Sequence, residues 1–252
     1  MEQVAFITGA SSGIGYYLAI ELARKGYSLA LVARRYDLLQ NLAQKLQAES
    51  LALACDVGDQ VQVKQAVAET ISRFGRIDLA ILSAGISKTT SSLNFKAGNF
   101  ETLLRTNTLG VAYCLEELIS LMRHQNSGTI AAISSLAGDR GVPGSAGYSA
   151  TKAALSTLFD GMRVDLSKHG IRLVTIEPGF IQTPMTEGFG KMPYLMQADE
   201  AARLILRRIE EGERVIRFPL VPSIFMKLLR FLPVSLFDAI SGKIRVVRLD
   251  TE

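Results

Sequence analysis

The residues TGASSGIG, at positions 8 to 15, follow an apolar run at 4–8 and precede a stretch with the apolar spacing of a helix. Gly9, Gly13 and Gly15 permit a tight turn and let the backbone come close to a ligand. A helix that begins in such a turn directs its free N–H groups and positive dipole end toward the turn, where a pyrophosphate can bind. Because the turn joins a strand to a helix, it predicts a dinucleotide-binding site and not merely a packing turn.

Beyond this turn, short apolar runs rich in β-branched residues alternate with helical patterns. Such alternation predicts an α/β fold, a parallel sheet with helices on both faces. Residues 1–218 are expected to form this domain, followed by an apolar, basic extension at 219–252. The expected strands are 4–8, 28–33, 50–54, 79–83, 128–134, 172–177 and 214–218. The expected helices are 13–25, 35–48, 59–74, 99–124, 148–168 and 198–211.

Composition limits the class of protein. The 252 residues, 48% of them hydrophobic, suffice for one α/β domain with a full core. Cys55 and Cys114 have no metal-type spacing, so we expect a reduced, cytoplasmic protein without a metal. The first ten residues lack the basic region of a signal peptide, and no apolar stretch is long enough to span a bilayer. Residues 214–248 hold seven Lys or Arg and one acid, but without an aromatic-basic motif they do not predict nucleic-acid binding.

The end of the second expected strand indicates which dinucleotide binds. NAD-binding folds of this type carry an acid there, which accepts a hydrogen bond from the ribose 2′-hydroxyl. Here Ala33 is followed by Arg34 and Arg35, and guanidinium groups would instead bind a 2′-phosphate. We therefore expect NADP(H) as the cofactor, with Arg34 as the main contact. Arg35 is expected to contribute less and to begin a solvated helix.

The sequence GYSATKAAL at 147–155 places Tyr148 and Lys152 four residues apart, on one face of a helix. The pair is either an ordinary surface contact or a phenol adapted to proton transfer. An adjacent ammonium favours the phenolate and would lower the phenol's pKa from its ordinary value of about 10. A carbonyl that accepts a hydride needs a proton, and Tyr148 could supply it as a general acid.

Together these motifs resemble the short-chain dehydrogenase/reductase family over residues 3 to about 218. The Gly-x-x-x-Gly-x-Gly spacing of the turn and the Tyr-x-x-x-Lys pair carry the resemblance. It implies a three-layer Rossmann fold, a doubly wound seven-stranded parallel sheet ordered three-two-one-four-five-six-seven, and a homodimer or homotetramer. It also implies that Lys152 holds the nicotinamide ribose, with the cationic oxidised ring lowering the pKa of Tyr148 further.

The resemblance implies two further catalytic residues. Ser135 lies thirteen residues before Tyr148, where a hydroxyl would donate to the developing oxyanion of the substrate. Its neighbour Ser134 is the alternative, although we expect it to point into the sheet. Asn107 would anchor a water that links Lys152 to solvent. The structural alternative is a polar helix residue whose side chain is satisfied by the backbone.

Cofactor contacts are implied at the ends of other strands. Asp56 and Val57 would contact adenine, and the Thr183 hydroxyl would fix the nicotinamide carboxamide together with the backbone of Ile181. The chain reads Leu-Ser-Ala-Gly where the family has Asn-Asn-Ala-Gly, which affects local stability and ribose contacts more than the chemistry. The full expected set is Gly9, Ser11, Ser12, Gly13, Ile14, Gly15, Arg34, Arg35, Asp56, Val57, Ala84, Gly85, Tyr148, Lys152, Pro178, Gly179, Ile181 and Thr183.

Two further segments lie outside the motifs described above. Residues 185–196, glycine-containing and apolar, are predicted to form a substrate lid. Residues 221–240 predict two apolar helices separated by Pro233, with Lys227 and Arg230 on the first. This extension would pack on the active-site rim or a second subunit, or attach peripherally to a membrane.

The predicted function is NADP(H)-dependent interconversion of a carbonyl and a secondary alcohol on a lipophilic small molecule. The alternative is an NADP(H)-binding regulatory or membrane-peripheral interaction protein with little turnover.

Overall fold

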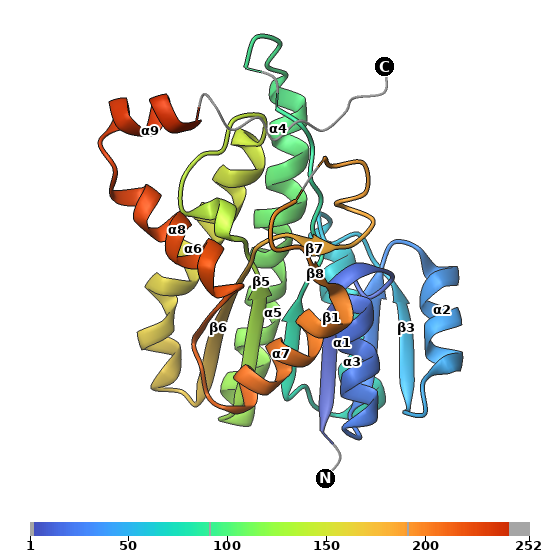
Figure 1. The fold of residues 1–252 in the computed structure, drawn as a ribbon. Helices are drawn as coiled ribbons and strands as arrows, with labels where there is room; N and C mark the ends of the chain where they lie inside the picture. The colour runs from blue at the N-terminus through green and yellow to red at the C-terminus, as the bar shows by residue number, and fades with distance from the viewer. Residues whose placement is uncertain (1–2, 91, 191, 242–252) are drawn as a thin grey trace.

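The fold is a three-layer α/β structure, seen in a computed structural model that describes residues 3–90, 92–190 and 192–241 (Figure 1). Seven parallel strands form the sheet in the order β3-β2-β1-β4-β5-β6-β9. This confirms the predicted doubly wound sheet and its order, β9 being the seventh strand. The strands are β1 (Val4–Thr8), β2 (Ser28–Ala33), β3 (Ser50–Ala54), β4 (Leu79–Leu82), β5 (Gly128–Ile133), β6 (Ile171–Pro178) and β9 (Val215–Phe218).

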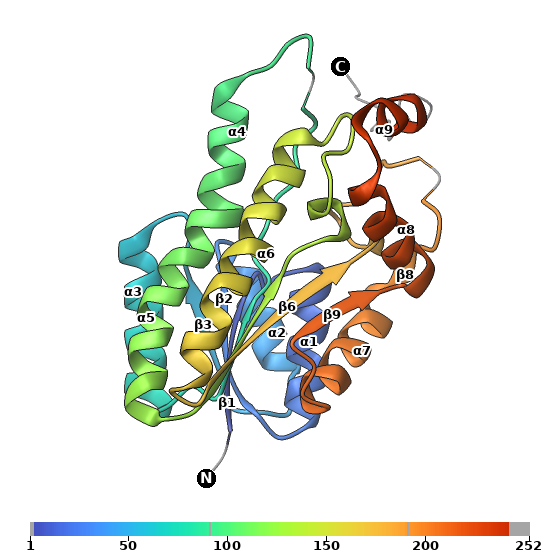
Figure 2. The same cartoon turned by 90° about the vertical axis from the view of Figure 1, so that its left-hand side faces the viewer.

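Helices cover both faces of the sheet, as Figure 2 shows edge-on. Alternate strand residues supply the two cores: Ile7 packs with the helices of one face, whereas Phe6 packs with those of the other. One face carries α1 (Gly13–Arg24), α2 (Tyr36–Lys45) and α7 (Ala198–Glu210). The other carries α3 (Gln60–Phe74), α5 (Gly110–Gln125) and α6 (Ala146–Ser167), and α4 (Ala97–Leu104) continues the line of α5 beyond the sheet.

Two helix ends carry capping residues, the start of α3 and the end of α1. The carboxylate of Asp59 accepts hydrogen bonds from the backbone N–H groups of Val61 and Gln62 at the start of α3. Gly26 follows α1 with a φ of +82° and donates its N–H to the carbonyl of Ala23. Gly26 therefore marks where α1 ends before β2, and Asp59 marks where α3 begins after β3.

The single helix predicted at 99–124 is instead three segments. A π-helical turn, Arg105–Leu109, lies between α4 and α5. The period of apolar residues does not reveal such an insertion, because the flanking helices keep their own spacing. The wider turn brings Thr106 to the cavity described below and buries Asn107 completely.

Two small features lie beyond the carboxyl ends of the strands. The short strands β7 (Ile181–Gln182) and β8 (Met196–Gln197) pair in parallel and hold the ends of the predicted lid together. The extension forms α8 (Leu220–Phe231) and α9 (Val234–Ser241), separated near Pro233 as predicted. Among the described residues, no helix has both the length and the apolarity needed to cross a membrane.

Candidate active site

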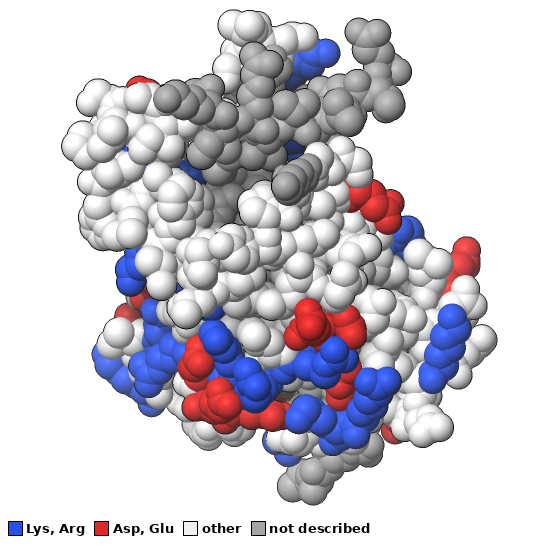
Figure 3. Space-filling view, viewed as in Figure 1, with Lys and Arg blue, Asp and Glu red and all other residues white. Residues whose placement is uncertain are grey.

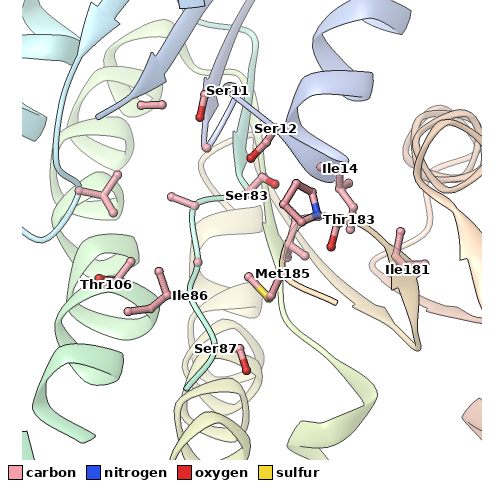
Figure 4. Close-up of a pocket in the computed structure, with 18 of the residues that line it drawn as sticks. Ser11, Ser12, Ile14, Ser83, Ile86, Ser87, Thr106, Ile181, Thr183 and Met185 are labelled. Carbon is pink, nitrogen blue, oxygen red and sulfur yellow. The ribbon is translucent and has the colours of Figure 1, made fainter. Parts of the chain in front are cut away.

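A cavity of about 500 Å³ opens at the carboxyl edge of the sheet, where the strand ends converge. Figure 4 shows Ser11 and Ser12 at the β1–α1 turn, Ser83 and Ile86 along the segment after β4, and Thr183 next to Ile14. Gly15 and Asn107 are the two predicted site residues that do not line the cavity. Those that do are Gly9, Ser11, Ser12, Gly13, Ile14, Arg34, Arg35, Asp56, Val57, Ala84, Gly85, Ser135, Tyr148, Lys152, Pro178, Gly179, Ile181 and Thr183.

The glycine-rich turn has the geometry of an anion site. Gly9 and Gly13 have φ values of +69° and +60°, a left-handed conformation that side chains disfavour. Ser12 precedes α1 without a side-chain hydrogen bond to the helix, so no side chain caps the first N–H groups. Gly15 lies beneath the turn, where a Cβ would be 2.6 Å from the carbonyl oxygen of Gly9. Its role is to let α1 approach β1.

The substitution Gly9→Ala is expected to lower the free energy of unfolding more than Gly26→Ala, by about 1–3 kcal/mol. Both positions have positive φ, but a Cβ at Gly9 would lie 2.8 Å from the backbone of Ala84, whereas one at Gly26 meets nothing within 4 Å. Urea denaturation of the two variants isolates the packing effect. Equal losses would show that the β4 segment does not constrain the turn.

The two arginines after β2 occupy different places. The Nη1 of Arg34 lies 3.9 Å from a carboxylate oxygen of Asp56, and the Arg34 side chain is 66% exposed. Arg35 is the N-cap residue just before α2, and its Nη2 donates to the hydroxyls of Ser11 (2.9 Å) and Ser12 (2.7 Å). The guanidinium of Arg35 thus folds back over the turn and does not simply point into solvent. How much Arg35 contributes to NADP(H) binding stays a prediction.

Tyr148 and Ser135 meet in the cavity. Burial raises the pKa of Tyr148 above its ordinary value, and a hydrogen bond with the Ser135 hydroxyl acts in the opposite direction. The Ser135 oxygen also accepts from the N–H of Ala137 at 3.1 Å. Ser134 instead donates to the carbonyl of Lys152 at 3.0 Å and is buried. The choice of Ser135 over Ser134 is thus consistent with where each hydroxyl points.

Lys152 is buried, with 4% of its surface exposed. Its Nζ donates to the carbonyl of Ile133 at 2.7 Å and lies 5.6 Å from the centre of the Tyr148 ring. Burial lowers the pKa of Lys152 to about 8. The predicted lowering of the pKa of Tyr148 by Lys152 is wrong for this structure, because burial of the phenol is the dominant effect.

Asn107 connects two segments of the site without reaching the cavity. Its Oδ1 accepts from the N–H of Ile86 at 2.9 Å, and its Nδ2 donates to the carbonyl of Ile86 and the hydroxyl of Thr151. The side chain thus matches the structural alternative, satisfied by its neighbours, and holds the segment after β4 against α6. Its role in anchoring a water stays a prediction.

Several lining residues were not expected. The loop after β7 closes on the turn, since a Cβ at Gly13 would lie 3.2 Å from the methyl of Thr183. Cys55 and Ser83 could have been predicted, because they come directly after strands and ligands bind at the carboxyl ends of parallel strands. Nothing in the sequence around Ile86 and Thr106 indicates that they line the cavity. The lining residues outside the expected cofactor and catalytic set are Ala33, Cys55, Ser83, Ile86, Ser87, Thr106, Ile133, Ser134, Pro184, Met185 and Thr186, of which Met185 and Thr186 begin the predicted lid and Ser134 is the alternative serine.

The arrangement fits a dinucleotide. The cavity runs from the uncapped start of α1 and the guanidinium of Arg35 to the hydroxyls of Ser135 and Tyr148. An anionic pyrophosphate suits the first end and a reacting carbonyl the second. Within the described ranges, no group of three or more His, Cys, Asp or Glu side chains is arranged to hold a metal ion.

Known proteins are similar to this chain in sequence and in fold. A family model described as short chain dehydrogenase matches residues 3–193. An uncharacterized oxidoreductase of Myxococcus xanthus (strain DK1622) is 33% identical over 96% of this chain and 98% of its own length. The 3-oxoacyl-acyl-carrier-protein reductase FabG of Staphylococcus epidermidis is 34% identical over 74% of this chain and 78% of its own. The crystal structure of levodione reductase, 29% identical, has a TM-score of 0.80 and covers 88% of this chain and 98% of that one. This chain therefore belongs to the short-chain dehydrogenase family of oxidoreductases, whose members bind a nicotinamide cofactor.

Proposed function

We propose that this enzyme uses NADP(H) to interconvert a carbonyl and a secondary alcohol on a lipophilic small molecule. The observation that carries the proposal is the convergence of Ser135, Tyr148 and Lys152 in one cavity with the glycine-rich turn and two arginines. The alternating helices and strands could form a nucleotide-binding fold even if these side chains were absent. Their grouping supports chemistry at the nucleotide.

The side chains divide the work of carbonyl reduction. Bound NADPH supplies the hydride. The Ser135 hydroxyl donates to the substrate oxygen as negative charge develops there, and Tyr148 transfers its proton to that oxygen. The raised pKa of Tyr148 keeps the phenol protonated at neutral pH, which suits a proton donor. Lys152, whose Nζ donates to the carbonyl of Ile133, would bind the ribose hydroxyls.

Activity should appear as oxidation of NADPH when the purified protein is given a panel of ketones, aldehydes and acyl thioesters. The apolar substrates of the panel are expected to react faster than small polar ones. Absence of NADPH oxidation with every compound, from protein that binds NADPH, would reject the proposed reaction. Tight binding without turnover, together with a co-purifying partner, would favour the alternative of a regulatory NADP(H)-binding protein.

Cofactor preference tests the two arginines. Arg34→Ala and Arg35→Ala are each expected to weaken NADPH binding about tenfold or more while leaving NADH binding within about twofold, because charge-assisted contacts to a 2′-phosphate are lost. Fluorescence titration of NADPH and NADH measures both affinities. Lys45→Ala, at the exposed end of α2, serves as the charge-matched control. Equal losses for the two nucleotides would remove the arginines from 2′-phosphate recognition.

The extension is proposed to contact a membrane surface peripherally. Figure 3 shows charged side chains gathered over the lower half of the molecule, with the surface over α8 and α9 mostly uncharged. Lys227 and Arg230 are exposed on α8, where they could meet anionic lipid. The basic residues Lys243, Arg245 and Arg248 lie outside the described residues. The exposed large apolar residues of the two helices are Leu220, Val221, Ile224, Phe225, Leu228, Phe231, Val234 and Leu236.

Flotation with vesicles of phosphatidylcholine and phosphatidylserine tests this contact. Leu228→Ser with Phe231→Ser is expected to lower the bound fraction several-fold, because these side chains are 62% and 77% exposed and would enter the interface. The matched control is Val61→Ser with Val164→Ser, apolar residues of α3 and α6 that are 64% and 65% exposed. If the tail variant and the control float alike, the tail does not bind membranes.

We further propose a homodimer or homotetramer in the cytoplasm, built from a catalytic domain at 1–218 and the extension at 219–252. Cys55 and Cys114 are free and buried, which suits a reducing compartment.

A further inference from the structure

The short turn that carries Ser135 is attached to the C-terminal extension. Ser135 begins a single 3-10 turn, η2 (Leu136–Gly138), and Asp139 and Arg140 follow it directly. Neither of these two residues lines the cavity. Both instead contact the segment formed by β9 and α8, Asp139 near its start and Arg140 near its end.

Arg140 contacts the C-terminal end of α8. Its Nη1 donates to the carbonyl of Leu229 at 2.7 Å and to that of Leu232 at 2.8 Å. The last carbonyls of a helix lack their full set of partners. The guanidinium gives the Leu232 carbonyl a donor and adds a second donor to the Leu229 carbonyl, which also accepts from the N–H of Leu232 at 3.3 Å. The same guanidinium lies 3.9 Å over the ring of Phe237 in α9. Arg140 thus holds both helices of the extension.

Asp139 contacts β9, the strand that leads into α8, through Arg217. The Asp139 carboxylate pairs with the Arg217 guanidinium, with one Nη1–Oδ1 distance of 3.2 Å. Their side chains are only 9% and 22% exposed, so the pair is weakly screened. Arg217 also pairs with Glu177 of β6, whose other oxygen accepts from Ser156 of α6. The network therefore joins the Ser135 turn to β6, β9 and α6.

The turn between Ser135 and Arg140 is short and held by its own hydrogen bonds. The N–H of Gly138 donates to the carbonyl of Ser135 at 3.0 Å, and the N–H of Asp139 donates to that of Leu136 at 3.1 Å. With the bond from Ala137 to the Ser135 hydroxyl, these bonds leave little freedom between residues 135 and 140. A shift at Asp139 or Arg140 is therefore carried to Ser135.

We propose that Asp139 and Arg140 are positioning residues: by docking the Ser135 turn onto α8, they let the C-terminal helices set where the Ser135 hydroxyl meets the substrate oxygen. The kinetic consequence rests on the proposed function, whereas the docking itself does not. The extension would then affect catalysis although it lies outside the cavity.

Arg140→Met tests the proposal in the full-length protein, with Lys227→Met as an exposed charge-matched control on α8. Amide hydrogen exchange of a peptide covering 135–140 is expected to be about tenfold faster in Arg140→Met and unchanged in the control. Arg140→Lys, which keeps a cationic donor for the carbonyls, should restore much of the protection. Asp139→Asn provides a second variant with the same expected direction, should Arg140→Met fold poorly.

Kinetics with a reactive carbonyl supply the second measurement. We expect Arg140→Met to lower kcat about tenfold with KM within about twofold, because the lost interaction belongs to the transition state. Unchanged exchange, or wild-type kcat in a variant whose turn exchanges faster, would overturn the proposal. If the wild type reduces no carbonyl, the proposed function fails, and exchange alone still decides whether α8 fixes the turn.

Discussion

Replacing Tyr148 with Phe is expected to lower kcat for carbonyl reduction by about 10²–10⁴-fold, the usual effect of removing a general acid. In the proposed function the phenol is the proton donor, and it lines the cavity and hydrogen-bonds with the Ser135 hydroxyl. Since the substitution removes one oxygen and keeps the ring, the cavity wall should persist. NADPH affinity is therefore expected to stay within about threefold, because the lost oxygen contributes at most one hydrogen bond to the cofactor.

Tyr113→Phe is the matched control, because Tyr113 of α5 packs against the core and does not line the cavity. Single-turnover reduction of a carbonyl by prebound NADPH separates the chemical step from cofactor binding. Wild-type rates in the Tyr148→Phe variant would assign the proton to another donor. Loss of NADPH binding with the rate would indicate a role in holding the nucleotide instead.

Local patterns were sufficient to predict most of the fold. The strand β1, the glycine-rich turn and the start of α1 follow from adjacent residues, because strand period, positive φ and helix initiation are properties of a few neighbours. The parallel order of the sheet followed from the family resemblance and is confirmed. The π-helical turn at Arg105–Leu109 could not be predicted, because it packs against a helix distant in the chain: Asn107 and Thr108 both hydrogen-bond to Thr151 of α6.

Within the site, residue identities were easier to predict than interactions. Tyr148, Lys152 and Ser135 follow from spacing, and all three line the cavity. The fold of Arg35 back onto the turn depends on the distance between β2 and α1, which no sequence spacing gives. The pKa of Lys152 likewise depends on burial by residues distant in the chain. The predictions about the site differed from the structure where a property depends on contacts between residues distant in the chain.

Lys152→Met is expected to stabilise the protein while abolishing most activity. In the wild type, burial lowers the pKa of Lys152 from its ordinary value of 10.5 to about 8, so folding at pH 7 places an ammonium in a poorly solvated position. A shift of this size corresponds to roughly 3 kcal/mol of destabilisation below pH 8. The hydrogen bond to the Ile133 carbonyl would be lost in the variant, which reduces the net gain to about 1–3 kcal/mol.

The pH dependence gives the sharper test of Lys152. Between pH 8 and 10.5 the unfolded lysine holds a proton that the folded one has released, so the free energy of unfolding of the wild type gains a contribution that rises with pH. The variant lacks this contribution, and its advantage should shrink across that window. Urea denaturation at pH 7, 8, 9 and 10 measures the difference, with Lys168→Met, an exposed lysine after α6, as the control. A variant that is less stable than the wild type at pH 7, or whose advantage persists unchanged at pH 10, would mean that the buried ammonium is solvated or paired in solution.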